Sequence, residues 1–297
     1  LEFRRVLFRS SVPQTLITGI DTRAAVNNTA GSCGCTTGND IFFNFTVPAG
    51  PRQIIYADTL GSNWDTSLFV QTSTGTNVTA TNLPTNGVAC NDDNGLTGCG
   101  TGLQSQIMLL LNPGAYRLVI SGCGAGGTTT NLRFHHLPVG NGAVAAINAG
   151  NSTPGGTTSG TGVITQACGG GASGPDNTYY WHTCTATAAG SFTASTCGRA
   201  TWDTVLEQRS ASRTANVCND DVGGTCGVRS SVTAAIPDGP GLHVFYVDGF
   251  AGGSGAYTVA VTRPLPDPPT RRGAQVGTAA LLPPRRIPAF RPRRASQ

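Results

Sequence analysis

The chain has 297 residues, and its 41 Gly, 18 Pro and single Met make it rich in turn residues and poor in helix formers, so we expect an all-β protein. Its formal net charge of +4 comes from the two ends, because Ser11 to Thr262 hold 8 Arg against 13 acidic residues, a balance of −5. An acidic centre excludes the basic face that a nucleic-acid-binding protein needs.

The first ten residues, Leu1–Ser10, show no strand pattern that continues beyond Ser10. Their end reads like a translated cloning or adapter sequence, so we exclude them from the fold as non-native or disordered. Because the chain begins with Leu1 rather than Met, we expect it to be a piece of a longer exported protein.

Short runs of β-branched, aromatic and aliphatic residues, bounded by turn residues, predict two consecutive β-sandwich modules. In the first module, at 11–138, the predicted strands are Ile41–Val47, Gln53–Ala57, Thr66–Gln71, Gln106–Leu111 and Tyr116–Ser121. In the second module, at 143–263, they are Thr178–Ala186, Gly190–Ser195, Thr204–Gln208, Ser231–Ala235, Leu242–Asp248 and Ala256–Thr262.

The boundary between the modules is placed at Pro138–Gly142, and the Gly- and Thr-rich stretch Asn151–Gly162 is interpreted as a loop inside the second module. The Pro- and Arg-rich tail at 264–297 is expected to be disordered. Its one apolar patch is far too short to span a membrane.

Two motifs occur once in each module, in the same order. A Trp-Asp-Thr turn stands at Trp64–Thr66 and again at Trp202–Thr204, and a Cys-Asn-Asp-Asp loop stands at Cys90–Asp93 and again at Cys218–Asp221. The turns lie 138 positions apart and the loops 128, so the first copy carries ten extra residues, in the Thr-rich stretch from Val70 to Val88. The chain is therefore predicted to be two copies of one module.

This order of motifs, followed by a Pro/Gly turn and a final pair of strands, resembles the pre-peptidase C-terminal (PPC-like) modules of secreted bacterial proteases and surface proteins. The resemblance covers nearly all of Val12 to Thr262. It implies a jelly-roll-like β-sandwich that is non-catalytic, often binds calcium and is attached to another domain.

The ten cysteines show neither zinc-type nor redox spacing, so they indicate disulfide bonds and a secreted or cell-surface location. Short spacing within each loop predicts two local disulfides, Cys90–Cys99 and Cys218–Cys226. A third bridge, Cys184–Cys197, is predicted across a turn. Outside the loops each module has three cysteines, which leaves open a bridge between the modules or one thiol that is free or paired elsewhere; they are Cys33, Cys35, Cys123, Cys168, Cys184 and Cys197.

Adjacent carboxylates repel each other unless a cation or N–H donors offset their charge, and Ca²⁺ prefers about six to eight oxygen ligands. If the sheet places each turn beside its loop, each module has the carboxylates of a calcium site. The candidate ligands are Asp65, Asp92 and Asp93 in the first module and Asp203, Asp220 and Asp221 in the second. The alternative is that these Asp side chains only cap turns.

No catalytic motif is recognisable in the sequence, which has no G-x-S-x-G elbow and no zinc-protease helix, and Glu207 is the only Glu between Ser11 and Thr262. We therefore expect a non-enzymatic accessory or adhesion pair, monomeric as part of a larger chain, with an extracellular protein or a polysaccharide as its partner. One alternative is the accessory part of a secreted hydrolase (a peptidase) whose catalytic domain lies upstream. Another is a carbohydrate-binding module that uses Trp64, Trp202 and Tyr179–Trp181, although aromatic residues in strands usually pack in cores.

Overall fold

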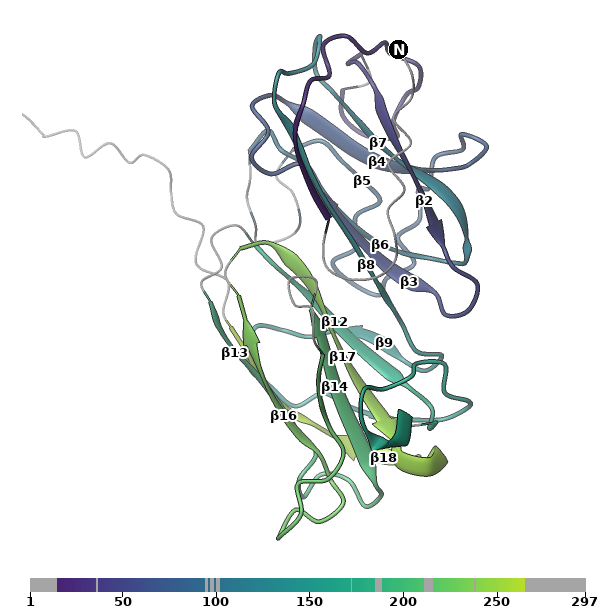
Figure 1. Ribbon diagram of the computed structural model, residues 1–297, viewed down its shortest axis with the longest axis vertical. Helices are drawn as coiled ribbons and strands as arrows, with labels where there is room; N and C mark the ends of the chain where they lie inside the picture. Colours follow the sequence, from purple (N-terminus) through teal and green to yellow (C-terminus); the bar gives the residue numbers. More distant parts are fainter. Residues whose placement is uncertain are drawn as a thin grey trace, which may run out of the picture.

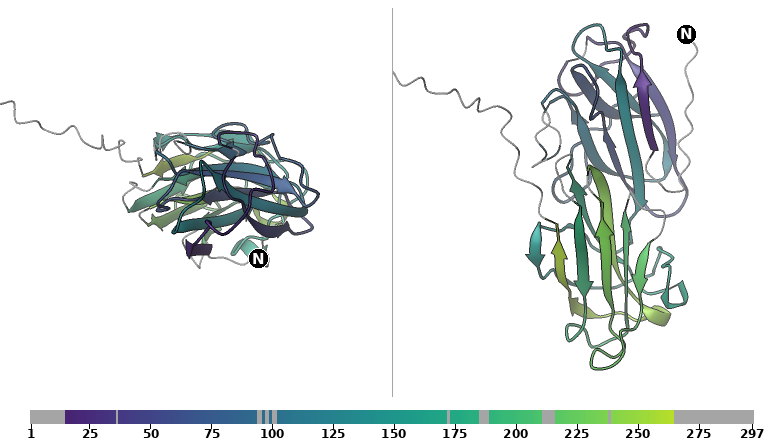
Figure 2. Two further views of the ribbon diagram at one scale, coloured as in Figure 1. Left: turned by 90° about the horizontal axis from the view of Figure 1, so that it is seen from above. Right: turned by 60° about the vertical axis from the view of Figure 1, so that its left-hand side comes forward.

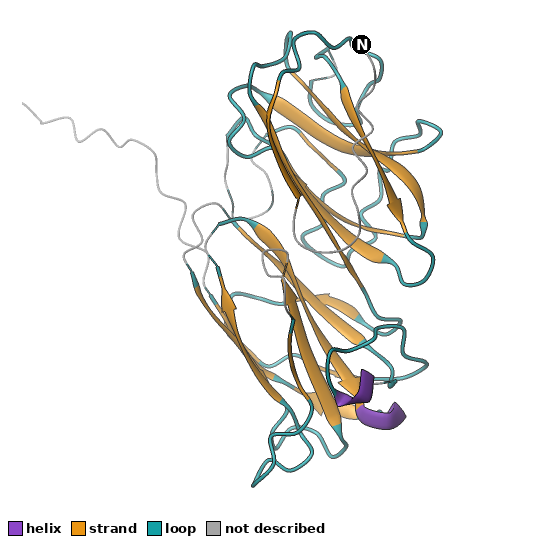
Figure 3. Cartoon of the chain, viewed as in Figure 1, coloured by secondary structure: helices purple, strands orange, loops and turns teal. Residues whose placement is uncertain are grey.

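The computed structural model describes residues 15–35, 37–93, 96, 99, 102–171, 173–184, 189–210, 216–237 and 239–264. Within these residues the regular structure is β-strand apart from two single-turn 3-10 helices, η1 (Gly169–Gly171) and η2 (Phe250–Gly252) (Figure 3). The predicted all-β class is confirmed. The predicted unstructured ends, 1–10 and 264–297, lie outside the described residues except for Pro264.

The first module contains eight strands in two antiparallel sheets (Figure 1). One sheet has the order β1-β8-β3-β6 and the other β2-β7-β4-β5. Two four-stranded sheets connected in this way are a jelly roll. The strands are β1 (Thr15–Ile20), β2 (Ile41–Val47), β3 (Gln53–Asp58), β4 (Thr66–Thr72), β5 (Cys90–Asn91), β6 (Gln106–Leu111), β7 (Gly114–Gly122) and β8 (Thr130–Pro138).

The second module repeats this topology. Its sheets have the orders β10-β19-β13-β16 and β15-β14-β17-β12, and β9 extends the second of these by pairing in parallel with β12. Strands β10, β12 to β17 and β19 therefore correspond to β1, β2 to β7 and β8. The strands are β9 (Val144–Ala146), β10 (Gly150–Ser152), β11 (Gly155–Thr157), β12 (Asn177–Thr183), β13 (Gly190–Ser195), β14 (Thr204–Ser210), β15 (Val217–Asn219), β16 (Ser231–Ile236), β17 (Gly241–Gly249), β18 (Ala256–Thr258) and β19 (Ala260–Arg263).

Each module has its own hydrophobic core between its two sheets. In the first, alternate residues of β2 turn inward, with Phe43, Phe45 and Val47 buried and the residues between them exposed. In the second, the Trp181 ring stacks on the Phe192 ring at 4.8 Å between centroids. A third buried cluster contains residues of both modules, which lie one after the other along the long axis (Figure 2).

The interpretation of Asn151–Gly162 as a loop is wrong, because this stretch contains parts of β10 and all of β11. Strand β10 pairs with β19 at a sheet edge, as β1 pairs with β8 in the first module. Strands β10 and β11 have three residues each and no apolar side chain, so backbone hydrogen bonds hold them in place and no hydrophobic alternation marks them. The predicted strand Ala256–Thr262 is divided in two at Val259.

All ten cysteines form disulfides, but the three predicted pairs are wrong. The bonds are Cys33–Cys90, Cys35–Cys123, Cys99–Cys184, Cys168–Cys218 and Cys197–Cys226. In each module the loop cysteine beside the Asp pair bonds to a segment that precedes β2 in module 1 and the equivalent β12 in module 2. This segment is here called the strap (28–35 in module 1, 163–170 in module 2). Cys33–Cys90 and Cys168–Cys218 are thus equivalent bonds.

The remaining pairs differ between the copies for a visible reason. Cys226 bonds to Cys197, which directly follows Thr196, whereas the matching residue after Thr59 in module 1 is Leu60. Cys99, the equivalent of Cys226, has no such partner and bonds across to Cys184 of module 2. Of the two possibilities left open for the odd cysteines, the bridge between modules is the one that occurs.

Among the described residues, no helix has the length and apolar character needed to cross a bilayer.

Candidate metal sites

Strand pairing brings each Trp-Asp-Thr turn beside its Cys-Asn-Asp-Asp loop. Asp65 directly precedes β4, and Asp92 and Asp93 directly follow β5. Because β4 and β5 are antiparallel neighbours, with Leu68 opposite Asn91, the start of one lies next to the end of the other. The second module repeats the arrangement between β14 and β15. In both modules, therefore, the turn and the loop lie side by side, as one acidic site per module requires.

The second site is a compact group of three carboxylates. Asp203, Asp220 and Asp221 each place one carboxylate oxygen within 4.8 Å of the others. The site adjoins η2, since the Asp203 carbonyl accepts the backbone N–H of Phe250 at 3.3 Å. Both 3-10 helices lie at the end of module 2 that points away from module 1 (Figure 3). The site is therefore at the free end of the pair.

The first site holds the corresponding carboxylates in a looser group. Asp65 interacts with the charges of both Asp92 and Asp93. The Asp92 carboxylate also accepts the backbone N–H of Cys35 and lies within 4.8 Å of the sulfurs of Cys35 and Cys123. Those sulfurs are bonded to each other, so they do not ligate a metal.

The electrostatics of the two sites are alike. Burial raises the pKa of Asp203 and of Asp220 above their usual values. The charge of Asp221 raises the pKa of Asp203 further, and the charges of Asp203 and then Asp221 raise that of Asp220. The pKa values of Asp65 and Asp92 are raised by burial and then by the charge of Asp93. Uncompensated negative charge thus accumulates at the same place in each module.

Four of these carboxylates also have a buried oxygen without a hydrogen-bond partner in the part of the chain that the structure describes. The atoms are Oδ1 of Asp65, Asp92, Asp203 and Asp220. If the carboxylates only capped turns, these oxygens would accept N–H groups. A cation at the centre of each group would satisfy them and offset the repulsion.

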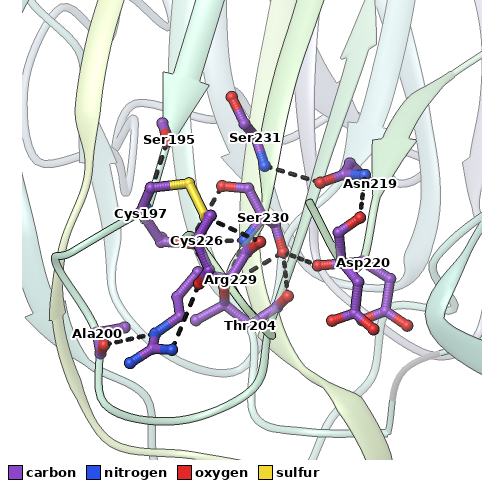
Figure 4. Close-up of a disulfide and its surroundings, with 12 residues drawn as sticks. Ser195, Cys197, Ala200, Thr204, Asn219, Asp220, Cys226, Arg229, Ser230 and Ser231 are labelled. Atoms are coloured by element: carbon purple, nitrogen blue, oxygen red, sulfur yellow. Dashed lines mark hydrogen bonds between the residues drawn. A yellow bond between two sulfur atoms is a disulfide. The ribbon is translucent and has the colours of Figure 1, made fainter. Parts of the chain in front are cut away.

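A network of hydroxyl groups fixes the backbone beneath each site. In module 2 the Ser230 hydroxyl bonds to the carbonyls of Thr204 and Asp220, and it lies 3.2 Å from the Thr204 hydroxyl (Figure 4). That hydroxyl lies 2.7 Å from the Thr196 hydroxyl. Ser105 makes the same contacts in module 1. The Thr of the motif and this serine thus connect the turn to the loop by hydrogen bonds. The sequence analysis did not identify the serine.

The Asn of each loop stabilises the loop itself. The Asn219 side chain accepts the backbone N–H of Ser231 at 2.8 Å and donates to the Asp221 carbonyl at 3.2 Å (Figure 4). Asn91 makes the equivalent bonds in module 1. The conformation of both Asp pairs is therefore set by the next strand of the chain.

A glycine of each strap lies close to one of the candidate ligands. Gly34 and Gly169 occupy equivalent positions, both with φ of +61°. A Cβ on Gly34 would lie 2.1 Å from Cγ of Asp92, and one on Gly169 would lie 3.4 Å from Cγ of Asp220. Only glycine combines this conformation with such a close approach at Gly34. In the sequence, each of these glycines directly follows a cysteine, and this pair of residues was the signal that could have identified the strap.

The two motif tryptophans are packed against their own modules. Trp64 donates its indole N–H to the Thr130 hydroxyl at 2.8 Å, and Trp202 donates to the Ala256 carbonyl at 3.0 Å. A Cβ on Gly255 would come within 2.7 Å of the Trp202 ring. Trp181 lies in the core of module 2. These rings do not form one exposed platform.

A third group, Cys99, His182 and Cys184, also brings three possible ligand atoms together. Its two sulfurs form the bridge between the modules. We therefore treat it as part of that bridge.

Comparison with known proteins gives little further information. No family model matches the chain, and no curated protein matches it. Among solved structures, the CUB1-EGF-CUB2 domains of rat MASP-1 align over 88% of this chain and 100% of theirs, with 11% identity and a TM-score of 0.23. A protein from Eubacterium rectale that is described as secreted on a provisional basis aligns over 88% of this chain and 95% of its own, with 8% identity and a TM-score of 0.21. Neither likeness carries a structural or functional argument.

Proposed function

We propose that the chain is a non-catalytic extracellular module pair that binds one calcium ion in each module and serves as an accessory or adhesion unit of a larger secreted protein. The observation that carries the proposal is the recurrence, in both copies, of an acidic group with buried carboxylate oxygens that lack hydrogen-bond partners among the described residues. A turn cap would be expected to pair these oxygens with N–H groups.

The chemistry of the site favours calcium over a transition metal. The side-chain ligands that the described residues offer are carboxylates, and hard oxygen ligands suit Ca²⁺. The flexible coordination of Ca²⁺ accepts backbone carbonyls and water for the remaining positions. Binding would stabilise the fold, because the ligands come from a turn and a loop that are brought together only on folding.

The extracellular location is supported by five disulfides that use all ten cysteines. The accessory role is supported by the resemblance to PPC-like modules, whose implied jelly-roll sandwich has the strand order found here. Because the indole N–H groups of Trp64 and Trp202 are bonded within the chain, we favour this role over carbohydrate binding. A hydrolase accessory part remains compatible with the same two modules.

Thermal unfolding with EDTA and with excess calcium tests the proposal. At a free concentration about 100 times the Kd, calcium should add about 2.7 kcal/mol of stability, which for a chain of this size raises Tm by several degrees. Asp203→Asn with Asp220→Asn should abolish the part of the shift that belongs to module 2. Asp21→Asn, which breaks an exposed pair with Arg23, is the control and should leave the shift unchanged. An identical Tm in EDTA and calcium would sink the calcium proposal.

A further inference from the structure

The two modules meet face to face through sheets. The outer face of the β1-β8-β3-β6 sheet packs on the outer face of the β15-β14-β17-β12-β9 sheet, and the contact is fully buried. Module 1 contributes Ile54, Tyr56, Met108, Leu110 and Leu137, and module 2 contributes Tyr180, Leu242, Val244 and Tyr246. None of these side chains is more than 2% exposed.

Two tyrosines of module 2 also bind the backbone of module 1. The Tyr246 hydroxyl donates to the Pro138 carbonyl at 2.6 Å, and the Tyr180 hydroxyl donates to the Thr85 carbonyl at 2.6 Å. Tyr180 also accepts the Thr85 N–H at 3.3 Å. Thr85 belongs to the stretch in which the first copy has its ten extra residues. The stretch that holds the extra residues of module 1 thus contacts module 2 at the contact between the modules, here called the joint.

The equivalent sheet face in module 2 is polar. The β3–β6 pair of module 1 matches the β13–β16 pair of module 2 in register, which gives a counterpart for each of the four apolar joint positions on β3 and β6. The four counterparts are small or hydroxylated and lie exposed or half-buried, with Ser191 for Ile54, Thr193 for Tyr56, Thr233 for Met108 and Ala235 for Leu110.

The second comparison starts from the joint face of module 2 and asks which residues stand at the same positions of module 1. Matching β12 and β17 with β2 and β7 places Asn44 opposite Arg117 in module 1 where module 2 has Tyr180 opposite Val244. Ala115 stands where module 2 has Leu242. Asn44 and Ala115 are exposed and Arg117 is half-buried. At these three positions, therefore, module 1 lacks the apolar side chains that the joint covers in module 2, whereas Tyr246 corresponds to Val119, which is itself apolar and buried.

We infer that the outer face of the β1-β8-β3-β6 sheet is a dedicated docking surface for module 2, and that the two modules form an obligate pair with a fixed order. On the face formed by β3 and β6, apolar outward side chains of module 1 lie where module 2 covers them, and their counterparts in module 2 are small or hydroxylated. Phe69 and Val205, which are buried outside the module cores, lie instead against the straps. The docking face of module 1 therefore has no equivalent in module 2. The pair would associate without a covalent link, and neither free face would accept a further copy by the same contact. This inference does not depend on calcium binding.

The test uses the full chain with a specific protease site inserted after the exposed Asn141 in the connection between the modules, and with Cys99→Ser and Cys184→Ser to remove the covalent bridge. After cleavage the two halves should elute together in size-exclusion chromatography at a mass of the intact chain. Tyr180→Asn with Val244→Arg, which installs the residues of module 1, should make them elute separately. Asn44→Ala with Arg117→Ala at the same register positions of module 1 is the matched control and should leave them together.

Separate elution of the cleaved parent halves would overturn the inference. Retention of the Tyr180→Asn, Val244→Arg halves as a complex would show that this face does not hold the modules together. Near-ultraviolet circular dichroism before cleavage reports whether the Tyr180→Asn, Val244→Arg variant has folded. If this variant has not folded, the elution of the cleaved parent halves decides the inference.

Discussion

At the scale of single residues, Asp248 is the most unusual group in the second module. It is fully buried at the end of β17, beside the equally buried Asp176. Asp176 accepts two backbone N–H groups of the strap and the side-chain amide of Gln166, which stabilise its negative charge. The carboxyl groups of Asp248 and Asp176 interact by a hydrogen bond, which requires a proton between them. Burial, and next the charge of Asp176, raise the pKa of Asp248 to about 8, so Asp248 holds a proton at neutral pH.

This proton makes the stability of module 2 depend on pH. Because the folded state raises the pKa from 3.8 to about 8, the free energy of unfolding should fall as pH rises between these values, by up to about 1.4 kcal/mol per pH unit. Asp248→Asn keeps a donor toward Asp176 without titrating, so it should flatten the dependence and stabilise the protein near the upper end. Urea unfolding at several pH values measures this. An unchanged slope in the variant would contradict the assignment to Asp248.

The first module supplies the natural comparison for this residue. Register matching places Ser121 where module 2 has Asp248, while Asp40 accepts two strap N–H groups as Asp176 does. This pH dependence of stability is therefore expected from module 2 alone. Asp248→Ser should flatten it as Asp248→Asn does.

At the scale of elements, the straps hold the loops of the candidate metal sites. Each strap is bonded by a disulfide to the loop that carries the Asp pair, through Cys33–Cys90 in module 1 and Cys168–Cys218 in module 2. Each also places a glycine against one of the candidate ligands. The strap thus limits both the unfolded chain and the movement of the loop.

Removing the strap disulfide of module 2 should be costly. Cys168→Ser with Cys218→Ser opens a bridge across 50 residues, and the loss of loop-closure entropy corresponds to about 4 kcal/mol. Denaturant unfolding under oxidising conditions measures the loss, with the Cys99→Ser, Cys184→Ser pair as a reference that leaves the strap intact. A decrease below about 1 kcal/mol would show that packing alone holds the strap.

Strands with apolar residues bounded by turn residues were mostly predictable, although β1 and β8 were missed, and strands built from small polar residues were not predictable. The predicted bounds of Ile41–Val47, Gln106–Leu111 and Gly190–Ser195 agree with β2, β6 and β13, because apolar residues and turn residues mark both ends. Strands such as β10 and β11, built from Gly, Asn, Ser and Thr, carry no such pattern. Disulfide partners were mispredicted because Cys90 and Cys218 bond to straps that are distant in sequence, which spacing does not reveal.

At the scale of the whole molecule, duplication was predictable from the paired motifs, and the sequence also carried a signal for the joint. Strands β3 and β6 are buried at every position, whereas their counterparts β13 and β16 alternate between buried and more exposed residues. An unbroken apolar strand in a sandwich indicates that both of its faces are covered. The candidate sites were predictable as residue sets, but their assembly depended on strand order, which single-sequence patterns leave undetermined.

Calorimetric titration of the intact chain with calcium, after removal of bound metal by EDTA and dialysis, tests the central claim most directly. We expect two binding events per chain, of which Asp92→Asn removes one and Asp220→Asn the other, with both variants retaining the parent fold by circular dichroism. Absence of binding heat, with no change in Tm, would contradict the claim, and so would binding that survives both substitutions together.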